Sequence, residues 1–481
     1  MASSDKKTHM LFNRFGLGVT SHGFKSLGSD PLTACLAEIS ATSAIITDPT
    51  LPTTARAIQI VSEIEEKRRL ARAAQRNLAQ GVSQPPVAPP TNAGMSSPPT
   101  PAPPPPPDPD ELRLQDVFFA EMGARFRHGL AQPVGFTERW VMFWSNHFCV
   151  ATRRGPIMRS TVGVYEREAI RPHVFGTFSD LLIAAESHPA MLHYLDQRQS
   201  IGPNSPAGQR RQRGLNENLA REILELHTLG VGGGYAQADV TNFAKVLTGW
   251  SITGNEENLD GFGGFTFAAN RHEPGPQTVL GKLYGQSGQE QGLAVLRHLA
   301  THPSTAKFIA TKLARHFVAD KPPPALVARL EQVFRNTNGN LAALAKSLIT
   351  APESADAPFT KLRTPMEFLL ATYRATGEKP ERWQQLNNAL NLMGQPLWNP
   401  AGPNGHPDDI ASIAAPKAIK TRLDLALQFA RPLGGKHDPR ALAEAVFGET
   451  LSTETRQAIA RAETRPQGLA LLLMSPEMQR R

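Results

Sequence analysis

The chain has 481 residues, of which 40% are hydrophobic and 20% are charged. It contains no uninterrupted run of about 18 apolar residues, the length that a membrane-spanning helix needs. These properties exclude a membrane-spanning helix and predict a soluble globular protein. The net charge of +8, from 51 basic and 43 acidic residues that are largely interleaved, is a mild excess that disfavours nucleic-acid binding.

Cysteine usage and the first residues bear on the cell compartment. Cys35 and Cys149 are the two cysteines, so the sequence has neither a disulfide framework nor a paired-cysteine metal motif. The opening MASSDKKTHMLFNRFGLG contains two lysines but no apolar run of signal-peptide length. The sequence by itself therefore predicts a cytoplasmic protein, or an exported protein shown without its signal.

Residues 1–82 are predicted to form helices that dock on a larger body, because Leu11, Phe12 and Phe15 are apolar and 54–80 is amphipathic. Segment 83–110 is too rich in proline to continue a helix or a central strand. We expect it to be a flexible excursion that leads into the main helical domain, 111–481.

Apolar residues at helical spacing recur through most of 111–481, and alternating strand patterns of useful length are almost absent. The predicted fold class is therefore mainly α, with one large single helical body. Segment 251–280 differs in character, because it is rich in glycine and carries Phe262, Phe265 and Phe267. We expect a small irregular or hairpin insertion there.

The central stretch, NENLAREILELHTLGVGGGY over 216–235, predicts a helix with Asn216 as its N-cap and Gly230 as its left-handed stop. At about 100° per residue, one side of this helix is polar. It collects Asn218, Arg221, Glu222, Glu225 and Thr228. His227 points away from both carboxylates by the same rule, so we predict a hydrogen-bonded core histidine and not a ligand beside them.

The polar side of this helix has two interpretations. It is either a solvated surface with an Arg221–Glu225 ion pair, worth a few tenths of a kcal/mol, or a polar network that lines a cleft. Its position before Gly232, Gly233 and Gly234 favours the cleft modestly.

Several familiar catalytic motifs are missing. The sequence has no Gly-x-Ser-x-Gly elbow and no Gly-Lys-Ser/Thr phosphate loop. Its Gly230, Gly232 and Gly234 follow a helix and not a strand, so they do not form a dinucleotide fingerprint.

What remains is a scatter of polar residues on separate segments between about 147 and 272, as in sites that helical bundles assemble from several helices. The first hypothesis is a hydrolase that uses a carboxylate pair or a divalent metal with its activated water. Its predicted catalytic residues are Glu222, Glu225 and Asp239, and its predicted metal ligands are His147, Asp196 and His272.

The second hypothesis is a binding or assembly protein that docks an acidic partner or polymer through the polar helix and a basic loop. The predicted binding residues are Asn218, Arg221, Arg171, Arg210, Arg211, Arg213 and Tyr235. Both hypotheses stay open at the level of sequence.

Segments along nearly the whole chain resemble the bacterial domain-of-unknown-function eighteen-hundred family. They include LFNRFGLG at 11–18, FWSNHF at 143–148, YEREAIRPHVFGTFSDLL at 165–182, HPAMLHYLD at 188–196, NENLAREILELHTLGVGGGY at 216–235 and DVTNFAKVLTGW at 239–250. The resemblance implies a mainly helical fold. Because many members carry export signals and are encoded near sulfatase-like exported proteins, it also implies export and a sulfatase-like partner, while leaving the activity open.

Two segments depart from the family's pattern. The usual His-Asp-x-Gly-x-Lys element is HEPGPQ at 272–277, which lacks the lysine. PNGHPDDIASI at 403–413 stands where the family has a Gly-Trp and a later Trp, so a pocket built from those tryptophans is not expected here.

Overall fold

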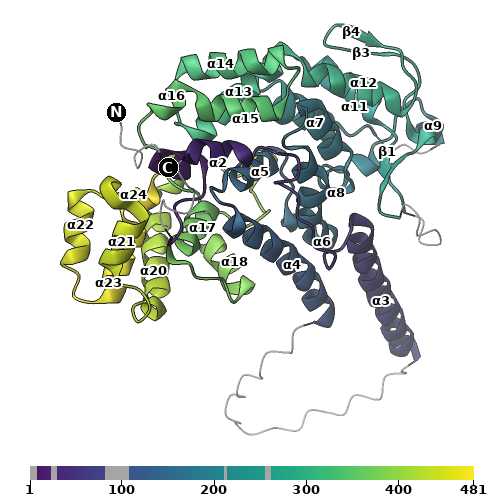
Figure 1. The fold of residues 1–481 in the computed structure, drawn as a ribbon. Helices are drawn as coiled ribbons and strands as arrows, with labels where there is room; N and C mark the ends of the chain where they lie inside the picture. The colour runs from purple at the N-terminus through teal and green to yellow at the C-terminus, as the bar shows by residue number, and fades with distance from the viewer. Residues whose placement is uncertain (1–7, 23–29, 82–107, 211–213, 255–261) are drawn as a thin grey trace.

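The computed structural model describes residues 8–22, 30–81, 108–210, 214–254 and 262–481 (Figure 1). The structure is 65% helical, and two small antiparallel hairpins supply its strands. The predicted fold class, mainly α with a small hairpin insertion near 251–280, is confirmed. Within the described ranges no helix is both long and apolar enough to cross a bilayer.

The amino-terminal quarter contains a π-helical turn, a short helix and two long helices. Their bounds are Leu11–Phe15 (η1), Pro31–Ala37 (α2), Thr54–Gly81 (α3) and Pro109–Ala131 (α4). Both α3 and α4 pack on α6 (Pro156–Tyr165) and extend away from the main body (Figure 1). Of the predicted excursion over 83–110, residues up to 107 lie outside the described part, and Pro109 already begins α4.

The middle of the chain begins with helix α5, which lies in the interior of the molecule. The elements from here to residue 210 are Phe136–His147 (α5), Thr152–Arg154 (η3), Pro156–Tyr165 (α6), Glu166–Ile170 (η4), Arg171–His173 (η5), Phe178–Ser187 (α7), Pro189–Tyr194 (α8), Gln197–Gln199 (η6) and Pro206–Arg210 (α9). The Glu38 carboxylate accepts hydrogen bonds from the backbone N–H groups of 134–137 at the start of α5. A carboxylate at this end satisfies free N–H groups and complements the helix dipole.

The helix predicted over 216–230 ends at Gly230 as the sequence indicates, but its N-cap is Glu217 and not Asn216. The Asn216 Oδ1 accepts from the Asn218 N–H at 2.9 Å, and Gly230 has φ +83°. Its interior differs from the prediction, because only Asn218–Glu222 is α-helical (α10) and Ile223–Thr228 is π-helical (η7). The Thr228 hydroxyl donates to the Ile223 carbonyl at 2.6 Å, and the Leu229 N–H bonds the Leu224 carbonyl five residues back.

Two hairpins follow α11 (Gln237–Leu247). Their strands are Trp250–Ile252 (β1) with Phe265–Phe267 (β2), and Gln277–Val279 (β3) with Lys282–Tyr284 (β4), with Ala269–Arg271 (η8) between them. Leu280 and Gly281 both have positive φ, as the tight turn between β3 and β4 requires.

The second half of the chain returns to helices. They are Gln289–Ala300 (α12), Pro303–Phe317 (α13), Pro324–Asn336 (α14), Leu341–Thr350 (α15), Pro352–Ala355 (α16), Pro365–Thr376 (α17), Trp383–Leu392 (α18), Ile410–Ile413 (α19), Pro416–Leu433 (α20), Pro439–Phe447 (α21), Gly448–Thr450 (η9), Thr453–Ala460 (α22), Arg465–Met474 (α23) and Pro476–Gln479 (α24). The last five α-helices lie together at one side of the molecule (Figure 1).

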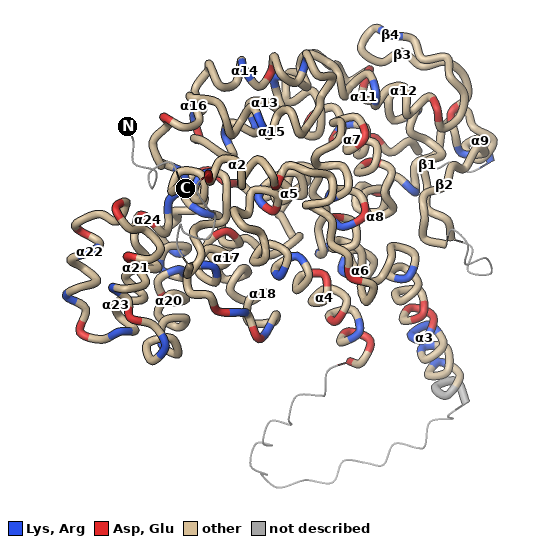
Figure 2. Tube along the Cα trace, viewed as in Figure 1, with Lys and Arg blue, Asp and Glu red and all other residues tan. Residues whose placement is uncertain are grey.

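α5 lies between α13 and α17, and this arrangement positions the site described below. The Trp140 ring is 5.9 Å from the Phe317 ring of α13, and Arg139 Nε is 3.0 Å from Glu367 Oε1 of α17. One apolar core contains buried residues from Leu11 to Met478. Basic and acidic residues both occur along α3 and α4 (Figure 2), in keeping with the mild net charge.

Candidate functional site

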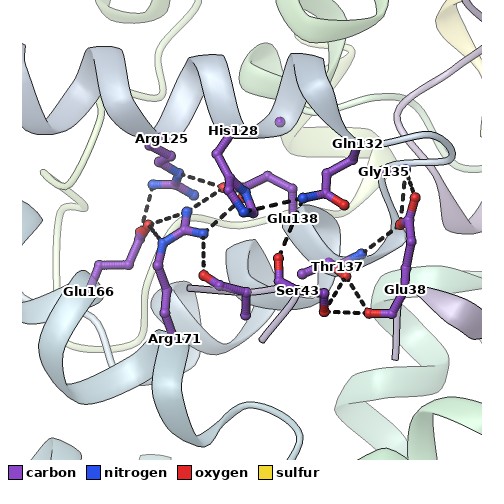
Figure 3. A network of polar contacts seen from close by, with 12 residues as sticks. Glu38, Ser43, Arg125, His128, Gln132, Gly135, Thr137, Glu138, Glu166 and Arg171 are labelled. Atoms are coloured by element: carbon purple, nitrogen blue, oxygen red, sulfur yellow. Dashed lines mark hydrogen bonds and ion pairs between the residues drawn. The ribbon is translucent and has the colours of Figure 1, made fainter. Parts of the chain in front are cut away.

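A buried ion network lies beside α5 (Figure 3). Arg171 Nη2 is 2.6 Å from Glu138 Oε1 and 2.9 Å from Glu166 Oε1, and Arg125 Nη1 is 2.9 Å from Glu166 Oε2. Burial opposes the charge of Arg171, but the two glutamates raise its pKa above the ordinary value. Arg171, predicted as a binding residue, is therefore fully enclosed by its own partners.

A cavity of about 100 Å³ adjoins this network. Its walls come from α4, α5, α13, α17, α18 and segment 395–408. Apolar side chains, among them Met142, Leu390 and Leu397, form part of the wall. The charged or titratable side chains that line it include Arg125, Cys149, His316, Glu367, His406 and Asp408. Its mainly apolar wall with a few convergent polar groups resembles that of small-molecule sites, although its volume is smaller than is usual for them.

His316 and Asp408 form a hydrogen-bonded pair in the cavity wall. His316 Nδ1 is 2.5 Å from Asp408 Oδ2, and the imidazole packs against the ring of Phe143 at 5.4 Å. His316 Nε2 is buried and has no hydrogen-bond partner in the described part of the chain. Burial opposes ionisation of Asp408, but His316 and Lys361 hold the pKa of this carboxyl well below its ordinary range.

Asp408 is itself held in place. Lys361 Nζ donates to the Asp408 backbone carbonyl at 2.7 Å and lies 3.5 Å from Asp408 Oδ1. The same amine is 2.8 Å from Asp320 Oδ1. A carboxylate that is ionised and fixed from behind sets both the orientation and the tautomer of the histidine that it contacts.

The second carboxylate in the wall, Glu367, has both oxygens engaged. Its Oε1 is 3.0 Å from Arg139 Nε, and its Oε2 is 3.0 Å from Arg481 Nε and accepts from the Thr364 N–H at 2.8 Å. Despite burial, these partners lower the pKa of Glu367. Glu367 is thus an ionised group that caps α17 and neutralises buried arginines.

Cys149 lines the cavity but is a poor nucleophile in this state. Its thiol donates to the Pro403 carbonyl at 3.2 Å, and burial raises the pKa of Cys149 to about 12. Since the thiolate is the reactive form of cysteine, this thiol stays protonated and inert near neutral pH.

A chain of polar contacts runs behind Cys149. Lys312 Nζ donates to His147 Nδ1 at 2.8 Å, and His147 Nε2 donates to the His227 carbonyl at 3.0 Å. His227 Nδ1 is 2.7 Å from Glu186 Oε1, with both side chains buried. Burial lowers the pKa of Lys312 to about 8 and lowers that of His147 well below its ordinary value. His227 is a core histidine, as predicted from the helical wheel.

The three predicted metal ligands do not come together. Both ring nitrogens of His147 are engaged by protein groups, and Asp196 Oδ2 accepts from Arg154 at 2.8 Å. His272 Nδ1 is 2.9 Å from the Thr248 carbonyl. Within the described ranges no three His, Cys, Asp or Glu residues are grouped as metal ligands would be.

The three predicted catalytic carboxylates also have different environments. Asp239 uses both oxygens structurally, because Oδ2 accepts from the Ala236 N–H at 2.8 Å and Oδ1 from the Leu280 N–H at 2.7 Å. Glu225 accepts from the Tyr235 hydroxyl at 3.0 Å. Glu222 is half-buried, and burial together with the charge of Glu225 raises its pKa. The catalytic roles of all three stay a prediction.

The Arg221–Glu225 ion pair of the solvated-surface interpretation is replaced by another pair. Arg221 Nη2 bonds Glu217 Oε2 at 3.0 Å, one turn toward the amino terminus, and Gln237 Oε1 of α11 at 3.0 Å. The π-helical turn η7 carries Glu225 away from the α-helical position that the wheel assumed. Asn218 and Arg210 are exposed, and Arg211 and Arg213 lie outside the described residues.

Most of the cavity residues lie outside the predicted window of 147 to 272, with Cys149 and Val150 as the exceptions. His316 and Asp408 are 92 positions apart and join through the fold, so no local spacing announces them. A weak signal was present, because the His-Pro-Asp-Asp of 406–409 falls in the segment where the chain departs from the family pattern.

With this geometry described, comparison with known proteins adds the family. The family model described as "Protein of unknown function (DUF1800)" matches residues 10–480. The chain belongs to the DUF1800 family. No curated protein and no solved structure matches it.

Three of the six segments that resemble DUF1800 contain the same structural feature. Three π-helical turns lie in them: η1 in the segment 11–18, η4 in 165–182 and η7 in 216–235. Each places polar side chains in the interior, such as Asn13, Glu166 and His227. π-Helical turns are rare and are found disproportionately at functional sites.

Proposed function

We propose that the protein is a hydrolase in which His316 acts as a general base in the cavity beside α5. The observation that carries the proposal is the pairing of His316 with Asp408 in the cavity wall. The opposite ring nitrogen of His316 is buried and has no hydrogen-bond partner in the described part of the chain. Buried polar atoms are nearly always bonded, so an exception of this kind calls for a functional explanation.

The positions of the protons on His316 and Asp408 support this role. Because the Asp408 carboxylate is ionised, it can only accept, so the proton of the neutral imidazole is on Nδ1. The Nε2 atom then carries a lone pair that can take a proton from a water molecule or from a substrate hydroxyl. Asp408 stabilises the imidazolium that results, as a carboxylate does for histidine in hydrolytic triads.

Water is the nucleophile in this proposal. The Ser145 hydroxyl in the cavity wall donates to Glu166 Oε2 at 2.8 Å, and the Cys149 thiol is protonated. Neither side chain is therefore set up to attack a substrate. A water molecule deprotonated by His316 would attack the scissile carbon, phosphorus or sulfur atom, and the imidazolium would return the proton to the leaving group.

The carboxylate-pair version of the hydrolase hypothesis has less support. Glu222 and Glu225 do not line this cavity, and Asp239 is committed to backbone N–H groups. The alternative, docking of an acidic partner through Arg221, Arg210 and the loop that follows, is weakened because Arg221 already pairs with Glu217.

The test is a set of chromogenic esters, p-nitrophenyl acetate, phosphate and sulfate, assayed with wild type and with His316→Gln and Asp408→Asn. We expect both variants to lose about 100-fold or more in rate on the ester that wild type hydrolyses, since a general base contributes at least that much. His173→Gln is the matched control, because His173 is half-buried and does not line the cavity.

Melting temperatures of the same variants separate catalysis from stability. Unchanged rates in both variants, or no wild-type hydrolysis of any of the three esters, would contradict the proposal. A loss of rate that only follows unfolding would show that His316 is a packing residue.

A further inference from the structure

We infer that this cavity selects an anionic small molecule and that Arg125 binds its negative group. The inference rests on the proposed function in that it names the substrate class of the same cavity. It is argued from the charges that face the hollow and from which of them are already engaged.

The two carboxylates in the wall are already engaged. Glu367 is paired with Arg139 and Arg481, and Asp408 is paired with His316 and Lys361. A cationic substrate would compete with these fixed cations for the same oxygens. The negative charge in the wall is thus neutralised by the protein and is not open to a ligand.

Arg125 is only partly engaged by its ion pairs. Its Nη1 is 2.9 Å from Glu166 Oε2 and its Nε is 3.5 Å from Glu138 Oε1 (Figure 3). The remaining terminal nitrogen, Nη2, makes no ion pair or hydrogen bond with any residue of the described part. Arg125 lines the cavity, so its open N–H groups are the positive charge that a ligand in the cavity can reach.

The guanidinium is also held rigidly. Glu166, its main partner, is fixed by Arg171, by the Ser145 hydroxyl at 2.8 Å and by the Trp398 indole N–H at 2.9 Å. The Trp398 ring lies 5.5 Å from the Arg125 guanidinium carbon. A buried cation that does not have to reorganise binds an anion more tightly than a solvated one.

The size and lining of the cavity limit the rest of the ligand. About 100 Å³, with Met142, Leu390 and Leu397 in the wall, accommodates a short apolar body and not a polymer segment. We therefore assign as substrate class a small molecule with a carboxylate or similar anion on a short apolar chain.

The experiment compares butyrate with butyramide, which match in shape and differ in charge. Binding is followed by the ¹³C-methyl NMR signals of Met142 and Met366, which both line the cavity. We expect wild type to bind butyrate at least about tenfold more tightly than butyramide. This preference should fall to within about twofold in Arg125→Gln and be kept in part by Arg125→Lys.

Equal affinities of wild type for butyrate and butyramide, or no binding of either, would overturn the inference. This outcome is measured on the wild-type protein alone, so it does not depend on whether a variant folds. His316→Gln should keep the butyrate preference, because that residue acts on the proton and not on the charge. If His316→Gln keeps the butyrate preference and also hydrolyses esters at the wild-type rate, His316 is not the base, and the anion site stands. If His316→Gln loses hydrolysis but wild type shows no preference for butyrate, the anion site is wrong, and the proposed base stands.

Discussion

Glu222 is a half-buried carboxyl group in the middle of the central stretch, and its pKa is raised by burial and by the charges of Glu225 and Glu186. An acid whose folded pKa lies above its unfolded value contributes stability at low pH, which is lost as the pH rises through the folded pKa. The ionised form therefore costs stability at neutral pH, by a modest amount because solvent reaches the group.

Glu222→Gln removes that cost. We expect its melting temperature to be about a degree higher than wild type at pH 7.5 and equal to wild type below pH 4, where both side chains are neutral. Differential scanning fluorimetry at the two pH values checks this. A variant that melts lower at pH 7.5 would show that the carboxylate makes a stabilising contact, and a loss of ester hydrolysis would restore Glu222 as a catalytic candidate.

At the scale of the element, the end of η7 is controlled by Gly230. Its φ of +83° is a conformation that side chains rarely adopt, and an added Cβ would lie 2.7 Å from Phe308 Cδ2. Gly230→Ala should therefore cost about 2 to 3 kcal/mol, the sum of backbone strain and a clash in packed surroundings.

Gly232 supplies the matched control for this cost. It has φ +75° but nothing within 4 Å of an added Cβ, so Gly232→Ala should cost only the backbone part, about 1 kcal/mol. Urea denaturation of both variants measures the difference. Equal costs would mean that the contact with Phe308 does not constrain the turn.

The same element shows how far residue types alone can lead. Gly230 as a stop follows from local backbone chemistry and is confirmed, whereas the N-cap is Glu217 and Asn216 lies one residue before it. The π-helical register inside the helix does not follow, because it depends on Thr228 and Leu229 bonding carbonyls five residues back. The predicted Arg221–Glu225 pair failed for that reason.

Site residues are harder to predict than elements. Arg171 was predicted as a binding residue, but a sequence cannot tell a cation that faces a ligand from one enclosed by Glu138 and Glu166. His316 and Asp408 come from α13 and a loop 92 positions later, and only tertiary packing joins them. Single-sequence reasoning finds candidates by local clustering, which this pair does not show.

At the scale of the whole molecule, buried arginines tie together segments that are distant in sequence. Arg374 of α17 donates to the carbonyls of Gly18 and Gln132, and Arg14 of η1 donates to those of Ser354 and Ala357. These contacts join the first residues to the second half of the chain.

The buried titratable groups predict how stability varies with pH. Burial lowers the pKa of His9 and of His193 to about 4, so their neutral forms stabilise the fold, and this contribution is lost as the pH falls below the unfolded value of 6.5. The pKa values of Glu138, Glu367 and Asp408 are lowered, so their contribution is present above the unfolded values and lost on further acidification.

We therefore expect the free energy of unfolding to decline from about pH 6.5 and to fall more steeply below about pH 4.5. Urea denaturation in steps from pH 8 to pH 3.5 measures this profile. A profile that stays flat down to pH 4 would contradict the assignment of these groups as buried and partnered.

The central claim of this account is that Nε2 of His316 is unprotonated while Asp408 holds the proton on Nδ1. ¹⁵N NMR of the histidine side chains, with the His316 signals identified by their loss in His316→Gln, tests it directly. The account predicts a protonated Nδ1 and a lone-pair-bearing Nε2 whose signal shifts when butyrate is added. A protonated Nε2 with a bare Nδ1 would contradict it, because Nε2 would then be a donor and not a base.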